Sequence, residues 1–277
     1  MYSYFRDTTP NAWCKTTSRA TLLLVARTQN IELPDGTTIP VLYEDRSVIA
    51  IDKPAGWMLI PYKWDKTDRN LHLAIDSSIR AGDYWARSRN SKYLRHVHRL
   101  DADTGGILLL ARSPGALHTF GRLFESRRMK KQYLAVTQGI PREKSWCCRT
   151  KIAVDSKQIG RMKIDLRNGK ETETHFRLIE VGDQTALIEA EPLTGRTHQI
   201  RLHLATSGLP VVGDSLYGKR VAATVNHPTG GSDTPLALRA VALAYFDPFR
   251  KKNVRIQAPV EQFCVGFGFA VPQGYSA

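Results

Sequence analysis

Two short stretches of the chain concentrate charged side chains next to apolar segments. Residues 98–106 (HRLDADTGG) precede the apolar run at 107–110, and residues 195–201 (GRTHQIR) precede a predicted helix. Charged groups beside a buried segment must be paired or lie in a solvated cleft. On a helix, His198 and Arg201 would share one face and could direct a cation into the same cleft as Asp101. Spacing alone leaves two readings open: an ion pair that anchors a loop, or a catalytic site.

The two carboxylates of the first stretch raise the possibility of glycoside hydrolysis. Glycosidases place two carboxyl groups on opposite sides of the scissile bond. In an extended segment Asp101 and Asp103 would share a face and lie side by side, and in a turn they would diverge. Neither arrangement builds an opposed pair, so we disfavour a hydrolytic glycosidase.

Several other kinds of site lack their motifs. The sequence contains no phosphate-binding glycine loop and no serine nucleophile elbow. His96 and His98 could share a strand face, but no further ligand stands at a suitable spacing, so we interpret them as structural. The cysteines form no C-x-x-C pair and stand at Cys14, Cys147, Cys148 and Cys264. We therefore expect no metal site, no disulfide framework and no nucleotide cofactor.

Cations and aromatic residues alternate between Arg80 and Arg99. The whole chain has 40 Lys and Arg against 26 Asp and Glu, a net charge of +14. Cations neutralise phosphates and aromatic rings stack on bases, so this segment predicts a nucleic-acid surface. The alternative is a solvated basic face whose aromatic residues belong to the core. The segment contains Arg87, Arg89, Lys92 and Arg95, interleaved with Tyr84, Trp85 and Tyr93.

Hydrophobic periodicity indicates the elements that must position these residues. Strands are predicted at 48–51, 106–111, 133–136, 176–181, 186–190, 241–245 and 254–256. A helix is predicted from Pro114, capped by Ser113, to about residue 130, and a second one at 198–206. Many short strands with few helices between them predict an α+β fold with a mixed, largely antiparallel central sheet flanked by helices and loops.

The first part of the chain lacks this regularity. We expect residues 1–38 to form an N-terminal extension and residues 39–277 to form one catalytic domain. The apolar run at 21–26 is far too short to span a bilayer, so we expect no membrane association. Cysteine usage predicts a reduced, cytoplasmic setting, and we expect a monomer.

Taken together, four stretches resemble the RluA family of RNA pseudouridine synthases. They are residues 53–56 (KPAG), 98–106, 131–133 (KQY) and 195–201, followed by Gly208, Pro210, Asp214 and Tyr217. The resemblance keeps its order from about residue 41 to 259. It implies the pseudouridine synthase catalytic fold and an enzyme that isomerises specific uridines in ribosomal or transfer RNA without a cofactor.

The resemblance also implies a role for individual residues. Asp101 would be the catalytic carboxylate, and Arg201 would pair with it and keep it ionised. Tyr133 would pack against the target base and help move a proton from carbon 5. Arg99 would fill the gap that the flipped uridine leaves in its stack. Together with the basic segment, we expect these residues to contact RNA: Arg99, Arg87, Arg89, Lys92, Arg95, Arg196 and His198.

Three positions depart from the family pattern. Gly105 stands where relatives usually have Ser, Asp52 where they have Asn, and Arg239 where they often have His. The main alternative function is a catalytically inactive RNA-binding or ribosome-assembly protein of the same fold. The presence of Asp101, Tyr133 and Arg201 together favours an enzyme. A basic hydrolase or nuclease would need metal ligands or opposed carboxylates, and the sequence shows neither.

Overall fold

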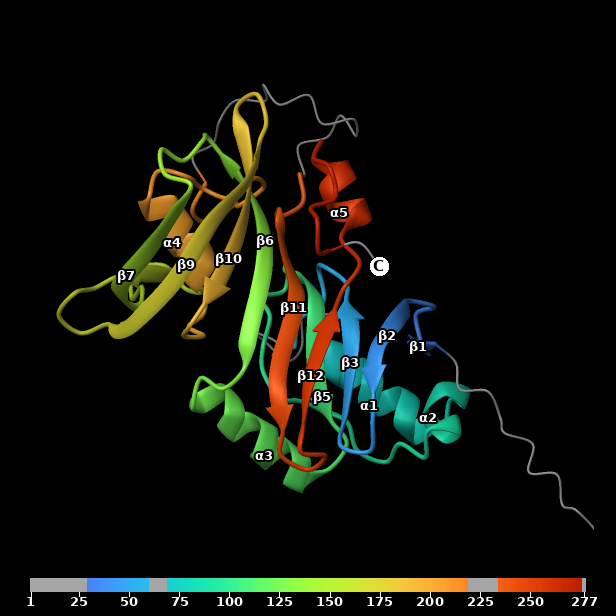
Figure 1. The fold of residues 1–277 in the computed structure, drawn as a ribbon. Coiled ribbons are helices and arrows are strands. Elements are labelled where there is room, and N and C mark those ends of the chain that lie inside the picture. The colour runs from blue at the N-terminus through green and yellow to red at the C-terminus, as the bar shows by residue number, and fades with distance from the viewer. Residues whose placement is uncertain (1–28, 60–68, 219–233, 276–277) are drawn as a thin grey trace, which may run out of the picture.

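A single mixed sheet runs through the molecule in the computed structural model, which describes residues 29–59, 69–218 and 234–275 (Figure 1). Within these residues the sheet has 12 strands in the order β1-β2-β3-β5-β11-β6-β10-β9-β7-β8, with β12 on β11 and β4 on β5. The described strands pair antiparallel except for β5 with β11. The predicted α+β class with a mixed, largely antiparallel sheet is therefore confirmed.

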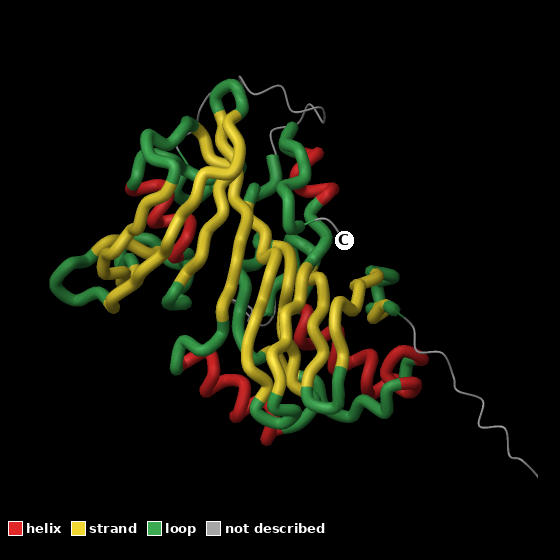
Figure 2. The backbone as a smooth tube through the Cα atoms, in the orientation of Figure 1, coloured by secondary structure: helices red, strands yellow, loops and turns green. Residues whose placement is uncertain are grey.

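The element bounds follow the chain. The strands are β1 (Asn30–Glu32), β2 (Thr38–Glu44), β3 (Val48–Lys53), β4 (Arg95–His96), β5 (Gly105–Ala111), β6 (Lys130–Gln138), β7 (Ser145–Val154), β8 (Met162–Ile164), β9 (Lys170–Val181), β10 (Thr185–Pro192), β11 (Leu238–Asp247) and β12 (Lys252–Gln257). The helices are α1 (Leu71–Ala81), α2 (Tyr84–Ser88), α3 (Pro114–Glu125), α4 (Gln199–Thr206) and α5 (Glu261–Gly266). Figure 2 shows the strands as one continuous layer with the helices outside it.

Strand β3 lies in the half of the sheet that is covered on both faces. Its Ile49 and Ile51 join a cluster with Trp85 of α2. Its Ala50 joins a different cluster with Phe120 of α3. Successive side chains of a strand point to opposite faces, so burial on both sides explains the uninterrupted apolar runs of β3 and β5.

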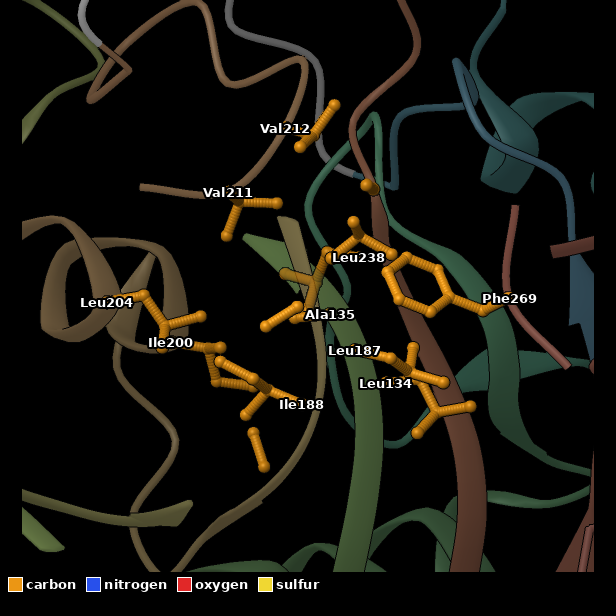
Figure 3. Packing of buried hydrophobic residues seen from close by; sticks show 14 of the residues in the cluster. Leu134, Ala135, Leu187, Ile188, Ile200, Leu204, Val211, Val212, Leu238 and Phe269 are labelled. Atoms are coloured by element: carbon orange, nitrogen blue, oxygen red, sulfur yellow. The ribbon is translucent and has the colours of Figure 1, made fainter. Parts of the chain in front are cut away.

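The other half packs around β6 and β10. Figure 3 shows Ile200 and Leu204 of α4 on the side of Ile188, while Phe269 lies on the side of Leu187. All five belong to one buried cluster. Helix α4 is therefore fixed against the sheet by its apolar side chains, which sets the direction of its first turn.

Helix α3 begins where the sequence predicted but ends earlier. Ser113 caps it by accepting a hydrogen bond from the Ala116 N–H at 3.1 Å. The prediction that it continues to about residue 130 is wrong, because the chain leaves the helix after Glu125 and Arg127 adopts a φ of 58°. Such a left-handed conformation stops a right-handed helix. The chain then enters β6 at Lys130.

The expected boundary at residue 38 falls inside a hairpin. Strand β1 pairs with β2 from Asn30↔Pro40 to Glu32↔Thr38. Ile31 and Leu33 are buried, and both belong to the core cluster that contains Trp85. The packed sheet therefore already includes residues 30–38, while residues 1–28 of the expected extension lie outside the described residues.

Candidate active site

A cavity of about 570 Å³ lies where the loop before β5, the start of β6, the end of α3 and the start of α4 meet. Its lining includes the three predicted catalytic residues, Asp101, Tyr133 and Arg201. These residues come from the sequence stretches 98–106, 131–133 and 195–201, which the fold brings together. The cavity has the volume typical of small-molecule sites.

A buried lysine holds the loop that carries Asp101. Lys53 is fully buried at the end of β3, and its Nζ donates to the backbone oxygens of Ala102 at 2.8 Å and Thr104 at 2.9 Å. A third bond, at 3.0 Å, goes to Pro54 O. Burial lowers the pKa of Lys53 to about 8, while the nearby Asp103 and Asp101 oppose the shift. The three carbonyl acceptors replace the lost water, so Lys53 ties the loop to the sheet.

Asp101 belongs to a buried ionic group with Arg201 and Asp214. Arg201 Nη1 lies 3.5 Å from Asp101 Oδ2, so the expected contact between these residues is present. Arg201 has a closer partner, because its Nε and Nη2 donate to Asp214 at 2.8 and 2.7 Å. Burial alone would lower the pKa of Arg201, but the hydrogen bonds and charge of Asp214, with a contribution from Asp101, raise it above its ordinary value. Arg201 is therefore a fixed cation, held by Asp214 and presented to Asp101.

Tyr133, on β6, also lines the cavity. Burial raises the pKa of its hydroxyl well above the ordinary value, and the charge of Asp101 adds to the shift. The hydroxyl therefore stays protonated at neutral pH. The ring packs against the core clusters on both sides of β6. Tyr133 thus offers a flat apolar surface, with a neutral O–H, to whatever enters the cavity.

His198 lies at the N-cap of α4 and faces the cavity as well. Its Nε2 is 3.8 Å from Asp101 Oδ2, and its Nδ1 is 2.9 Å from the Tyr217 hydroxyl. His198 and Arg201 therefore both approach Asp101 from the start of α4, although His198 precedes the helix with a left-handed backbone and is not part of it.

Cations surround the mouth of the cavity. Arg99, Arg127 and Arg196 line it and are exposed. Lys131 is partly buried in the lining, where its Nζ donates to Thr194 O at 3.0 Å. Burial lowers the pKa of Lys131 to about 8. The positive rim suits a polyanion that inserts one group into the cavity.

The residues of the predicted basic segment fall into two groups. Arg87 and Lys92 are exposed on and after α2. Arg95 is half-buried and forms an ion pair with Asp76 at 2.5 Å. Arg89 is 4% exposed and its Nε donates to Glu44 at 2.9 Å. Its guanidinium is used inside the fold, so we leave Arg89 out of the RNA-contacting set proposed below.

The sequence did not single out three residues of the site. Asp214 and Lys53 belong to the family-like stretches, but the sequence assigned them no role. Because Asp and Lys are rarely buried without a charge partner, their presence in these stretches could have indicated a structural ion pair or hydrogen bond. Lys131 stands two residues before Tyr133 on the same strand, so the period of two could have placed it on the cavity face. Asp103 is exposed and does not line the cavity, in keeping with the argument against an opposed carboxylate pair.

One group of described side chains could offer three ligand atoms to a metal ion: Cys147, Glu173 and His175. It lies on β7 and β9 and none of its members lines the cavity. Glu173 already accepts a hydrogen bond from Arg149 at 2.9 Å.

His98, which we interpreted from the sequence as a structural histidine, accepts a hydrogen bond from the Leu109 N–H at 3.1 Å and stacks on Phe124.

Among the described residues, no helix is both long and apolar enough to cross a membrane.

Residues 47–206 match the family model described as RNA pseudouridylate synthase. Among curated proteins, the chain is 34% identical over 249 residues to the ribosomal large subunit pseudouridine synthase D of Xylella fastidiosa, covering 84% of this chain and 69% of that one. It is 32% identical to the ribosomal large subunit pseudouridine synthase C of Buchnera aphidicola, covering 80% and 67%.

Solved structures resemble the fold. Human RNA Pseudouridylate Synthase Domain Containing 4 matches with a TM-score of 0.65 at 22% identity, over 82% of this chain and 90% of that one. Human RNA Pseudouridylate Synthase Domain Containing 1 matches with a TM-score of 0.61 at 24% identity, over 80% and 84%. The family match and the curated relatives confirm the resemblance that the four sequence stretches predicted. The chain therefore belongs to the family of RNA pseudouridine synthases.

Proposed function

We propose that this enzyme converts specific uridines of large-subunit ribosomal RNA to pseudouridine, with Asp101 as its catalytic carboxylate. One observation carries the assignment: Asp101 lies in the cavity beside Arg201, whose guanidinium is held by Asp214. The guanidinium lies close enough to the Asp101 carboxylate to stabilise its charge by direct electrostatic attraction.

The reaction balances without an external reactant. The bond between N1 of uracil and C1′ of ribose breaks, the base turns over, and a bond forms between C5 and C1′. C5 loses its proton and N1 ends with one, so nothing is oxidised or reduced. Asp101 acts at the ribose or the base, and Arg201 stabilises the carboxylate whenever it carries its negative charge.

Tyr133 and Arg99 have separate roles in this proposal. The Tyr133 ring supports the face of the base while it is detached, and its neutral hydroxyl stands close to where the C5 proton leaves. Arg99 is exposed at the cavity mouth, where it can occupy the space that the flipped uridine vacates. Arg196, Arg127 and the exposed Arg87 and Lys92 contact phosphates.

The choice of ribosomal over transfer RNA rests on the curated relatives, which are named as ribosomal large subunit enzymes. We further propose that the enzyme acts as a monomer in the cytoplasm, where such RNA is assembled. Light scattering of the purified protein and fractionation of cells test these two points. A stable dimer, or a protein found outside the cytoplasm, would overturn them.

The test of the function is pseudouridine mapping in total RNA from cells with and without the gene. The proposal predicts the loss of one or a few pseudouridines in large-subunit ribosomal RNA, restored by the wild-type gene. A loss confined to transfer RNA would reassign the substrate. An unchanged map, with purified protein that binds RNA but modifies none, would favour the inactive RNA-binding alternative.

A further inference from the structure

The backbone of His198 is held in a conformation that a residue with a side chain rarely adopts. Its φ is 55° and its ψ is 19°, in the left-handed region, directly before the first turn of α4. Local strain of this kind persists only where the surrounding structure enforces it. The conformation brings the imidazole to Asp101 and Tyr217 at once.

The hydrogen bonds of Tyr217 favour one tautomer of His198. The Tyr217 hydroxyl accepts a hydrogen bond from the Met162 N–H at 2.8 Å. Its own hydrogen is then available for Nδ1 of His198, 2.9 Å away. With Nδ1 as acceptor, a neutral imidazole carries its hydrogen on Nε2. Nε2 is the atom that faces Asp101 Oδ2 at 3.8 Å.

Tyr217 is itself well held. Its ring lies against the guanidinium of Arg201 at 5.4 Å and that of Arg161 at 5.3 Å, and it meets the His198 ring edge to face at 5.6 Å. The tyrosine therefore joins the start of β8, the first turn of α4 and the segment that carries Asp214. Its hydroxyl has little freedom to turn away from His198.

We propose that His198 is a positioning residue for Asp101: a neutral imidazole, oriented by Tyr217, whose Nε2 lies 3.8 Å from the carboxylate and acts on it by electrostatic contact and not by a hydrogen bond. This rests on the proposed role of Asp101. Both Arg201 and His198 approach the same oxygen, Oδ2. Their approach to Oδ2 restricts the carboxylate and leaves its other oxygen, Oδ1, available to a substrate. Sequence reasoning had assigned His198 to RNA contact, whereas this arrangement gives it a task inside the site.

The protonation state of His198 matters because of its charged neighbours. It faces Asp101, Arg201 and Asp214, with Arg99 at the cavity mouth and the Tyr217 hydroxyl on Nδ1. Burial lowers the pKa of His198, and the charge of Asp101 opposes the shift. A protonated His198 would add a second full cation beside Asp101 and hold the carboxylate in an ion pair. Activity therefore falls on the acid side when His198 gains a proton.

The positioning role predicts a change in the pH dependence of activity that a purely structural role of His198 would not produce. The Tyr217 hydroxyl donates to Nδ1 and so stabilises neutral His198. Tyr217→Phe removes the donor and keeps the ring, so protonation becomes easier and the acid limb of the rate profile moves to higher pH. His198→Gln removes the titrating group, so that limb disappears.

The experiment measures tritium release from in vitro transcribed large-subunit ribosomal RNA carrying 5-tritiated uridine, across pH 5 to 8. We expect His198→Gln to lower kcat about a hundredfold, as for a misplaced catalytic group, with KM changed little. Tyr217→Phe lowers kcat less and shifts the acid limb upward. The matched controls are His175→Gln and Tyr43→Phe, which lie outside the cavity and leave kcat and the pH profile unchanged.

The outcomes separate this inference from the function itself. Wild-type kcat with an unchanged acid limb in His198→Gln overturns the positioning role, as does a rise in KM alone, which assigns His198 to RNA binding. If His198→Gln fails to fold, an unmoved acid limb in folded Tyr217→Phe overturns the inference equally. Inactive wild-type enzyme on every RNA refutes the proposed function instead.

Discussion

Asp52 and Arg239 form an ion pair in which Arg239 Nη2 lies 2.6 Å from Asp52 Oδ2, although the residues are 187 positions apart. Gly105 is paired directly with Arg239 in the parallel β5–β11 ladder, and a Cβ at residue 105 would lie 3.4 Å from Arg239 Nη1. The three departures from the family pattern therefore meet at one place, behind the loop that carries Asp101. Gly105 places no side chain against the guanidinium of Arg239, and Asp52 supplies its charge partner.

This relationship predicts energetic coupling between Asp52 and Arg239. The two side chains are 16% and 17% exposed, so removing either charge leaves the other poorly solvated. We expect Asp52→Asn and Arg239→His each to reduce the free energy of unfolding by about 1–3 kcal/mol. The double variant should lose clearly less than the sum, as measured by urea unfolding in a double-mutant cycle. Additive losses would show that the two positions are independent.

Arg201 depends on Asp214 more than on Asp101. Asp214 also accepts hydrogen bonds from the N–H groups of Leu216 and Tyr217 at 2.9 and 3.0 Å. Asp214→Asn leaves the buried Arg201 without its main charge partner, so we expect a stability loss of about 3–5 kcal/mol. Activity should fall as well, although Asp101 is intact. Asp103→Asn is the matched control, since that carboxylate is exposed, and equal melting temperatures of the two variants would contradict the account.

A buried histidine in α4 predicts a pH dependence of stability. Thr172 Oγ1 donates to Thr150 O at 2.8 Å, so it accepts from His203 Nε2 at 2.9 Å, while Nδ1 accepts from Thr174 Oγ1 at 3.0 Å. Burial lowers the pKa of His203 to about 4. This network suits the neutral ring and fixes its tautomer.

The direction in which stability changes with pH depends on whether the folded or the unfolded protein binds the proton at His203. Between about pH 4 and the unfolded value of about 6.5, the unfolded chain binds a proton at this site and the folded protein does not. The contribution is complete above about pH 6.5 and is lost progressively as the pH falls to about 4. His203→Gln should therefore flatten this part of the stability profile, as read from urea unfolding at several pH values. His118→Gln, on the exposed side of α3, should leave it unchanged, and an unaltered slope in His203→Gln would refute the prediction.

RNA affinity should depend on the exposed cations and not on every arginine of the basic segment. We expect Arg87→Ala, Arg196→Ala and Lys92→Ala each to lower the salt dependence of binding, by about one unit of slope per lost phosphate contact. Arg89→Ala should instead reduce stability, because its guanidinium is paired with Glu44. Filter binding at several salt concentrations measures the slope. A reduced slope in folded Arg89→Ala would place that arginine on the RNA surface after all.

The sequence predicted the strands around the site well, because β3, β5 and β10 carry clear apolar runs or alternation. It missed α1, whose buried residues are Leu71, Ile75 and Ser78, a stripe too narrow and too polar to stand out. It also missed β7, where burial alternates weakly along a polar sequence. Such elements are stabilised by contacts with neighbouring elements, and the local periodicity of the sequence does not reveal these contacts.

The sequence predicted several of the residues that line the cavity, but not the strongest ion pair among them. The motifs named Asp101, Tyr133 and Arg201, yet the dominant partner of Arg201 is Asp214, 13 residues further along the chain. The sequence likewise could not tell that Arg89 is buried while Arg87 is exposed, since both stand in one basic segment. The tertiary structure determines which cation pairs with which anion, and the composition of a segment does not predict these pairs.

The most direct measurement is tritium release from 5-tritiated uridine in large-subunit ribosomal RNA by wild-type enzyme and Asp101→Asn. The amide keeps the size of the side chain and removes its charge. Arg201 remains paired with Asp214, so we expect a stability loss of only about 1 kcal/mol and RNA affinity within a few-fold of wild type. We expect the folded Asn variant to form no pseudouridine. A folded variant that modifies the RNA at a rate close to wild type would contradict the assignment of Asp101.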